Sequence, residues 1–204
     1  MIADIDQWKK MIRMSKIWFT SDTHFCHSKE FLWKPRGFDT NIQHDSAILE
    51  NWNNWVAPDD EVYLLGDVML ENDDLGLQFL GGLNGHIHIA IGNHDTENRI
   101  EKYKKCGNVV EIFYAKRIKI GKLWFWLCHY PTMTAQEDGR QVDKHIINLF
   151  GHTHQKEKFY NNNPYMYCVG LDTHDNRPVE LQEIIEDIKK KKEELNSENS
   201  NLNN

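Results

Sequence analysis

The sequence predicts an α/β fold in which short buried strands alternate with amphipathic helices. The first observation behind this prediction is a series of short apolar segments rich in Ile, Val, Phe, Tyr and Trp, a composition typical of buried strands. The second is that stretches with helical periodicity lie between several of these segments. The expected strands are Ile17–Ser21, Val62–Leu65, His86–Ile91, Leu123–Cys128, Ile146–Phe150 and Tyr165–Val169.

The predicted helices follow from the spacing of apolar residues and from the residues that end each pattern. They cover Asn41–Val56, Leu75–Leu80, Glu97–Cys106 and Leu181–Ile188. Pro58 stops the first of them, and Gly107 closes the third. A β-hairpin is expected where Tyr114–Ile120 and Leu123–Leu127 flank the turn residues Gly121 and Lys122.

The chain is expected to form one domain. Residues 14–188 contain neither an internal repeat nor a linker-like break, and 204 residues suffice for one sizeable core. Residues 1–13 are predicted to be an N-terminal extension or a short helix. The polar segment Thr132–Lys144 is predicted to be a loop near the site, and the charged, Asn/Ser-rich residues 189–204 are predicted to be disordered.

Composition limits the possible partners. The net charge of −7, from 24 Lys and Arg against 31 Asp and Glu, argues against a broad nucleic-acid surface, although bound cations would offset it locally. No apolar run approaches the roughly 18 residues of a membrane span, and no signal-peptide pattern opens the chain. We therefore expect a cytoplasmic protein with no membrane partner. The four cysteines are expected to be reduced thiols, because they show no paired spacing.

Metal-binding residue types follow the predicted strands, at the points where the strands end. In chain order these residues are Asp22 and His24, Asp67, Asn93 with His94 and Asp95, His129, and finally His152 and His154. In layered α/β folds, ligands bind beyond the carboxyl ends of the strands, so these side chains are expected to meet at one rim. The sequence therefore predicts a metal centre and, with it, a hydrolytic enzyme.

This order of motifs resembles the calcineurin-like metallophosphoesterase superfamily, from Ile17 to about Pro178. The resemblance extends to small, capless bacterial and phage members through three further stretches. These are Ser21–His27, Pro35–Phe38 and Val169–Val179. The resemblance implies a four-layer α/β/β/α sandwich built on two mixed sheets.

The resemblance also implies two divalent cations and the residues that hold them. One cation would take Asp22, His24 and His154, the other would take Asn93, His129 and His152, and Asp67 would bridge both. Mixed imidazole, carboxylate and amide ligands suit Mn²⁺, which we favour, as well as Fe or Zn²⁺. A hydroxide held between the two ions would attack phosphorus.

Four further residues are predicted to act near the substrate. His94 would protonate the leaving group as general acid. Asp95 would hold the His94 imidazole in the required tautomer, or would cap the following helix, or both. Arg36 would grip a phosphate oxygen, with a solvated loop side chain as the alternative. His27 would face the substrate or contact a ligand, with a partly exposed loop position as an equal alternative.

Two residues after the last strand, Asp172 and His174, are expected to support the ligands rather than to bind metal. The remaining histidines are expected to be structural or on the surface, and they are His44, His86, His88 and His145.

The predicted function is hydrolysis of a phosphoester, in a small molecule or a nucleotide. A phosphodiesterase is favoured over a phosphomonoesterase, because no cluster of basic residues awaits a dianionic monoester. The alternatives are a nuclease acting on DNA or RNA, a phosphomonoesterase, and a non-catalytic scaffold on the same fold. The complete set of ligand residue types counts against the scaffold.

Overall fold

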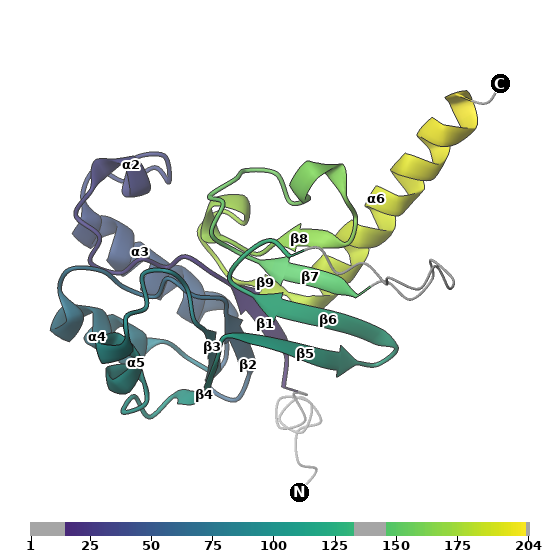
Figure 1. Ribbon diagram of the computed structural model, residues 1–204. Helices are drawn as coiled ribbons and strands as arrows, with labels where there is room; N and C mark the ends of the chain where they lie inside the picture. The colour runs from purple at the N-terminus through teal and green to yellow at the C-terminus, as the bar shows by residue number, and fades with distance from the viewer. Residues whose placement is uncertain (1–14, 133–145, 203–204) are drawn as a thin grey trace, which may run out of the picture.

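The computed structural model describes residues 15–132 and 146–202. Two mixed β-sheets form the centre of the protein (Figure 1). The predictions for residues 1–13 and for the loop Thr132–Lys144, apart from Thr132 itself, lie outside the described residues, as does His145.

The first sheet has the strand order β4-β3-β2-β1-β9. Its strands are β1 (Ile17–Thr20), β2 (Glu61–Leu64), β3 (His86–Ala90), β4 (Val109–Phe113) and β9 (Val179–Glu180). Strands β1 to β4 are parallel, and β9 pairs antiparallel with β1 at the edge. Three of the predicted strands therefore lie side by side, with their carboxyl ends at the same edge of the sheet.

The second sheet has the order β5-β6-β7-β8. Its strands are β5 (Ala115–Ile120), β6 (Leu123–Cys128), β7 (Ile147–Phe150) and β8 (Met166–Cys168). The predicted hairpin is confirmed, because β5 and β6 pair antiparallel, and β6, β7 and β8 are parallel. With one antiparallel pairing in each sheet, the predicted α/β class with two mixed sheets is confirmed.

Helices follow the strands of the first sheet. They are α2 (Glu30–Trp33), α3 (Asn41–Trp55), α4 (Asp73–Gly82) and α5 (Glu97–Tyr103). Side chains of Thr40, Asn72 and Thr96 accept a backbone N–H at the start of α3, α4 and α5, which is the usual N-cap arrangement. Two 3₁₀ turns, η2 (Tyr160–Asn162) and η3 (Leu171–Thr173), lie in the second half of the chain.

Apolar side chains form two main cores, one on each face of the first sheet. Between this sheet and the helices, Ile48 and Trp52 of α3 pack with Val62 and Ile87. Between the two sheets, the core consists of Phe19, Leu65, Phe125, Leu149, Tyr167 and their neighbours. On the outer face of the second sheet, Tyr160 of η2 packs against Phe150, Met166 and Cys168. The four cysteines are free thiols, as expected.

The prediction of a disordered tail is wrong for most of its length. Helix α6 runs from Leu181 to Leu202 and packs against β1 and β9 (Figure 1). Its Ile184 and Ile188 are buried in the core between the sheets, which anchors its first turns. Beyond them, the run Lys189–Glu194 consists of good helix formers, and the Lys191–Glu194 ion pair of 3.4 Å joins adjacent turns. A docked helix therefore continues through sequence that composition alone marks as disordered. Among the described residues, no helix is long and apolar enough to cross a membrane.

Candidate metal centre

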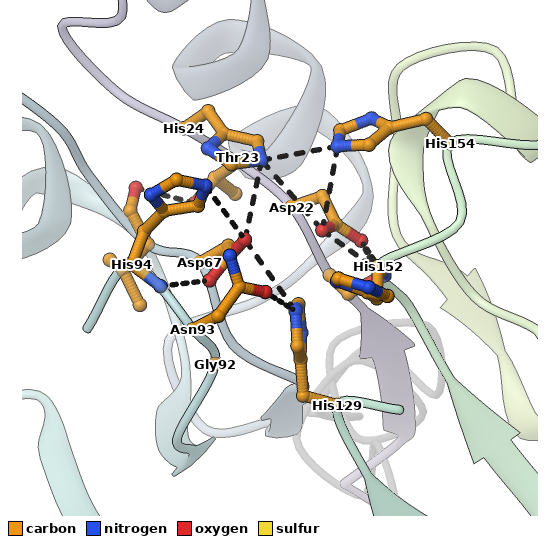
Figure 2. A network of polar contacts seen from close by, with 12 residues as sticks. Asp22, Thr23, His24, Asp67, Gly92, Asn93, His94, His129, His152 and His154 are labelled. Atoms are coloured by element: carbon orange, nitrogen blue, oxygen red, sulfur yellow. Dashed lines mark hydrogen bonds and ion pairs between the residues drawn. The ribbon is translucent and has the colours of Figure 1, made fainter. Parts of the chain in front are cut away.

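The predicted ligands lie in the loops that leave β1, β2, β3, β6 and β7, where the two sheets meet (Figures 1 and 2). Hydrogen bonds hold these loops together, because the Asp22 and His24 N–H groups donate to the carbonyls of Gly66 and Asp67, each at 3.0 Å. Two groups of ligand atoms form, each with its atoms within 4.8 Å of one another. The groups are Asp22, His24 and His154, which we call the first half, and Asp67, His129 and His152, which we call the second half.

In the first half, two imidazole nitrogens face each other. His24 Nε2 lies 3.3 Å from His154 Nε2. The Oδ1 atom of Asp22 lies 3.8 Å from the first of these nitrogens and 3.9 Å from the second. These separations leave room for an ion between the three atoms.

In the second half, the tautomer of His129 follows from its surroundings. Its Nδ1 lies 2.8 Å from the carbonyl oxygen of Leu65, which can only accept, so the proton is on Nδ1. The Nε2 lone pair then faces two oxygens, Asn93 Oδ1 at 3.0 Å and Asp67 Oδ2 at 3.5 Å. The ring of His152 lies edge-on, with its centroid 5.0 Å from that of His129.

The carboxylate of Asp67 lies between the two halves (Figure 2). Its Oδ2 atom is 3.7 Å from His24 Nε2 and 3.5 Å from His129 Nε2. Its Oδ1 atom accepts the backbone N–H of His94 at 2.9 Å, which holds the carboxylate in this orientation.

This donor set fits divalent cations. Lone pairs of nitrogen and oxygen that face one another without a proton repel, and a cation between them turns that repulsion into coordination. The lone pair of His129, turned toward Asn93 and Asp67 oxygens, is such a case. Imidazoles combined with carboxylates and an amide suit Mn²⁺, Fe or Zn²⁺ better than Mg²⁺ or Ca²⁺.

The backbone of the centre is strained. Five of the predicted ligands have positive φ angles, between 46° and 67°, and they are Asp22, His24, Asp67, His152 and His154. A residue with a Cβ in this left-handed region costs roughly 1 kcal/mol or more, and such strain collects at functional sites. Hydrogen bonds compensate for it, and the His152 N–H, for example, donates to Asp22 Oδ2 at 2.9 Å.

Two glycines permit this close approach of the loops. A Cβ on Gly92 would lie 2.2 Å from Asp67 Oδ1, and one on Gly151 would lie 2.2 Å from Ser21 Oγ and 2.4 Å from Asp22 Oδ2. Any side chain at either position would displace a predicted ligand, so the glycines that follow β3 and β7 are required by the site.

Two related proteins come from a phage and an archaeon, and a protein of similar fold comes from a bacterium. The chain is 30% identical to the Gene 66 protein of Mycobacterium phage D29, over 86% of this chain and 98% of that protein. It is also 30% identical to the uncharacterized protein MJ1445 of Methanocaldococcus jannaschii, over 88% and 94% of the two chains. The structure of AQ665 from Aquifex aeolicus, a protein of unknown function, superimposes with a TM-score of 0.64. It shares the fold at 22% identity and covers 85% of this chain and 99% of its own. No family model matches the chain.

The chain belongs to the same family as the phage Gene 66 protein and MJ1445. Its two mixed sheets and its two clusters of predicted ligands agree with the resemblance to the calcineurin-like metallophosphoesterase superfamily that the order of the sequence motifs carries.

Burial and neighbouring charges shift the pKa of His24, Asp67 and His154 in this centre. Burial, together with the charge of Arg36, lowers the pKa of His24 well below its ordinary value, which keeps the imidazole neutral. Burial raises the pKa of Asp67. His154 differs, because the hydrogen bond to Asp172 and the charge of Asp22 outweigh its burial and raise its pKa.

Asp95 does not orient the ring of His94. Its carboxylate accepts the N–H groups of Asp67 and Gly92, both at 2.8 Å, and of Val68 at 3.1 Å, together with the Tyr103 hydroxyl at 2.9 Å. The N-cap of α5 is Thr96, so the capping role is also wrong. Asp95 instead ties the loop after β3 to the loop after β2 and so positions Asp67. Three of its four donors, from Asp67, Val68 and Tyr103, come from other elements, which local sequence does not encode.

Arg36 does not face the substrate, and its prediction is wrong. The side chain is fully buried, and its Nε and Nη2 donate to Asp172 at 3.1 and 2.7 Å. Nη2 also donates to the Asp22 carbonyl at 2.9 Å, and Nη1 donates to His44 Nε2 at 2.9 Å. With these partners the guanidinium holds Asp172, which bonds His154, and the backbone of Asp22, so it positions two of the predicted ligands of the first half.

A chain of buried polar side chains extends this support. Asp172 accepts from His154 Nδ1 at 2.8 Å, which matches the supporting role expected for it. On the other side of Arg36, His44 Nδ1 donates to Asp45 at 2.8 Å. Asp45 was missed as a supporting residue. The signal was present, because His44 and Asp45 lie one turn before Ile48, on the apolar face of α3.

His94 and His27 lie at the outer side of the centre. The His94 side chain is 43% exposed, and its Nε2 lies 3.9 Å from Asp67 Oδ2. His27 packs edge-on against His24, with 5.6 Å between ring centroids, and its Nδ1 accepts the Lys29 N–H at 3.0 Å. The Nε2 of His27 therefore carries the proton.

Two other histidines have structural partners. His174 Nε2 donates to the Cys168 carbonyl at 2.9 Å, and His88 lies between Glu61 and Glu111 at 2.7 and 2.9 Å.

Proposed function

We propose that the protein is a phosphodiesterase that works with two divalent cations, Mn²⁺ in the first place and Fe or Zn²⁺ as alternatives. The observation that carries this proposal is the position of Asp67 Oδ2, 3.7 Å from an imidazole of the first half and 3.5 Å from one of the second. A carboxylate so placed has an oxygen within reach of both cation positions. When bound, such a pair of cations activates a solvent molecule and neutralises charge on the phosphate.

The ligand roles in this proposal follow the two halves. Asp22, His24 and His154 would hold one cation, Asn93, His129 and His152 would hold the other, and Asp67 would be shared. The buried, neutral imidazole of His24 favours this role, because its lone pair is available without loss of a proton.

His94 is the proposed general acid. Its ring is half exposed, where a leaving group could reach it, and its Nε2 lies 3.9 Å from Asp67 Oδ2, while its backbone N–H donates to Asp67 Oδ1. A proton given to the leaving oxygen removes the negative charge that would otherwise develop there.

A diester suits this centre better than a monoester. Among the described residues, no Lys or Arg side chain contacts the predicted ligands from the substrate side, and Arg36 is occupied by Asp172, Asp22 and His44. A dianionic monoester would call for such a cation, whereas a monoanionic diester needs less compensation. The net charge of −7 disfavours long polynucleotides for the related reason that they are polyanions.

The test compares hydrolysis of bis-p-nitrophenyl phosphate and p-nitrophenyl phosphate by the purified protein, first after chelation and then with Mn²⁺ restored. We expect turnover of the diester only with metal, at a higher kcat/KM than that of the monoester. A higher kcat/KM for the monoester would make the protein a phosphomonoesterase. Absence of turnover with two metal ions bound would support the scaffold.

A further inference from the structure

Two exposed aromatic rings lie beside the metal centre, Phe31 against His27 and Tyr130 against His129 and His152. Phe31 is 73% exposed and Tyr130 is 44% exposed. Exposing an aromatic ring to water costs free energy, because its apolar surface remains hydrated. Two such rings beside one site therefore indicate a surface that binds a ligand.

Phe31 reaches the first half of the centre through His27. In the short helix α2, Leu32 and Trp33 are buried, which leaves Phe31 on the outer side. Its ring lies edge-on to His27, with 5.3 Å between centroids, and His27 in turn lies 5.6 Å from His24. The face of Phe31 is therefore available at the edge of the first half.

Tyr130 occupies the corresponding place at the second half. It follows His129 directly, and its ring centroid lies 5.0 Å from that of His129 and 4.9 Å from that of His152. Both contacts are edge-on, so the ring stands at the border of the centre. The two aromatic residues thus flank opposite halves.

The other exposed aromatic rings of the described residues have different surroundings. Arg177 lies over Trp55 at 4.5 Å, and Arg117 lies over Trp124 at 4.7 Å. Tyr114, 74% exposed, stands between β4 and β5 and makes no ring contact with the centre. Only Phe31 and Tyr130 combine a large exposed ring with contact to the histidines of the centre or their immediate neighbour.

We propose that Phe31 and Tyr130 are stacking platforms for planar bases, one on each side of the scissile phosphate, so that the substrate is a short diester joining two nucleosides. This proposal rests on the proposed phosphodiesterase and names its substrate class. Base stacking on an aromatic side chain tolerates any base, because each base has a π-face. A diester has two groups on phosphorus, which matches one platform at each half of the centre.

Charge limits the length of this substrate. The chain carries a net charge of −7, and the described arginines nearest the centre point inward, to Asp172 in the case of Arg36 and to Asp73 in the case of Arg99. A long polynucleotide needs a continuous basic groove, which these residues do not supply. A dinucleotide or a similarly short diester needs the cations and the two rings only.

The test measures binding rather than turnover. The affinities of a phosphorothioate-linked adenosine dinucleotide and of dimethyl phosphate are compared by titration calorimetry on the full chain supplied with Mn²⁺. The ratio of the two affinities reports the two nucleosides, since both probes carry a monoanionic diester. In the wild type we expect the dinucleotide to bind more tightly, and we expect this ratio to fall by about 5- to 100-fold in Phe31→Ala and again in Tyr130→Ala, because each variant loses one stacked base.

Two controls make the result specific. Phe31→Trp should retain the ratio, because it keeps a stacking face. Tyr114→Ala removes an equally exposed ring away from the centre and should leave the ratio unchanged.

The failures of the two proposals are distinguishable. Metal-dependent hydrolysis of bis-p-nitrophenyl phosphate with an unchanged ratio in both alanine variants overturns the platforms and leaves the phosphodiesterase standing. A ratio that falls in both variants of a protein that hydrolyses no diester supports the platforms and overturns the phosphodiesterase. A fall in only one variant overturns the two-base substrate. Tight, steeply salt-dependent binding of a long single-stranded oligonucleotide overturns the restriction to short substrates.

Discussion

His154 in the first half of the centre and His129 in the second half are held by different kinds of partner. The Nδ1 of His154 bonds the carboxylate of Asp172, 18 residues away, whereas the Nδ1 of His129 bonds the backbone carbonyl of Leu65. The first ligand therefore depends on side chains that a substitution can remove. The second depends on the backbone of the first sheet, which no substitution removes directly.

The same contrast extends beyond the two histidines. In the first half, Asp172 is bonded by Arg36, which bonds His44, and His44 bonds Asp45, so four buried polar side chains stand in series behind the ligand. In the second half, Asp67 Oδ1 accepts the backbone N–H of His94, and the Asp67 N–H donates to the carboxylate of Asp95, so one side chain rather than a series of four stands behind this ligand. Because the four side chains behind the first half polarise one another through their hydrogen bonds, a substitution at any of them should change the metal affinity of the first half.

The largest effect should come from the residue that joins the halves. Asp67→Asn keeps the shape of the side chain but removes its charge, so neither half keeps the shared carboxylate. We expect diester hydrolysis to fall about 10⁴-fold, since a cation pair supplies several kcal/mol to the transition state. Metal content per chain, measured by plasma mass spectrometry, should fall as well. Two ions retained per chain would remove the bridging role.

His94→Ala tests a residue that belongs to neither half as a ligand. Metal content should stay at two ions, while diester hydrolysis should fall about 10²- to 10⁴-fold, the usual contribution of a proton-transfer group. Because nitrophenolate leaves without a proton, the loss should be smaller for a nitrophenyl ester than for an alkyl ester. Equal losses for both leaving groups would argue against the acid role.

Asp172→Asn tests whether the two halves are supported independently. Loss of the carboxylate behind His154 should weaken one of the two cations by about 10- to 100-fold and leave the other unchanged, as expected for a partner of a metal-bound histidine. Manganese titration followed by electron paramagnetic resonance would resolve the two affinities.

The matched control for this variant is Asp187→Asn, which removes a carboxylate bonded by Tyr167 and Lys158 away from the centre. It should change neither affinity. Because Asp172 also neutralises the buried Arg36, chemical denaturation of both variants should accompany the titration. Weakening of both cations to the same degree in Asp172→Asn would contradict separate support of the halves.

The smallest expected effect on the centre is a loss of folding stability at low pH, caused by His174, two residues after Asp172. Burial lowers the pKa of His174 to about 4, below the unfolded value of about 6.5. The unfolded chain therefore takes up this proton between pH 6.5 and 4 while the folded chain does not. Stability from this group is complete above pH 6.5 and declines toward pH 4, by about 3 kcal/mol.

Chemical denaturation of metal-free protein between pH 7 and 4 checks this sign. His174→Gln, which has an amide donor for the Cys168 carbonyl, should lose less stability over that range than the wild type. Parallel pH profiles for the two proteins would contradict the role of this imidazole.

The clustering of the predicted ligands was predictable because these residues are encoded locally. Each of them follows closely on a short apolar strand, and the parallel arrangement of those strands brings the loops together without further information. Gly92 and Gly151 also mark the turns after β3 and β7 in the sequence. A Cβ on Gly92 would collide with Asp67, and one on Gly151 would collide with Asp22.

The support behind the ligands was less predictable because it is encoded at long range. Arg36 and Asp172 are separated by 136 positions, so nothing near Arg36 indicates that a buried carboxylate will bind its guanidinium. The sequence around Asp95 likewise indicates only the adjacent His94 as a partner, whereas its partners Asp67, Val68 and Tyr103 come from other elements. Helix α6 shows the same limit, because docking of Ile184 and Ile188 extends order into a polar segment.

The most direct test of the two-half centre is a crystal structure of the protein grown with Mn²⁺, with anomalous differences recorded near the manganese edge. We predict two peaks roughly 3.5–4 Å apart, one beside Asp22, His24 and His154 and one beside Asn93, His129 and His152, with the Asp67 carboxylate between them. A single peak, or two peaks that do not share Asp67, would contradict the bridged pair on which the proposed function depends.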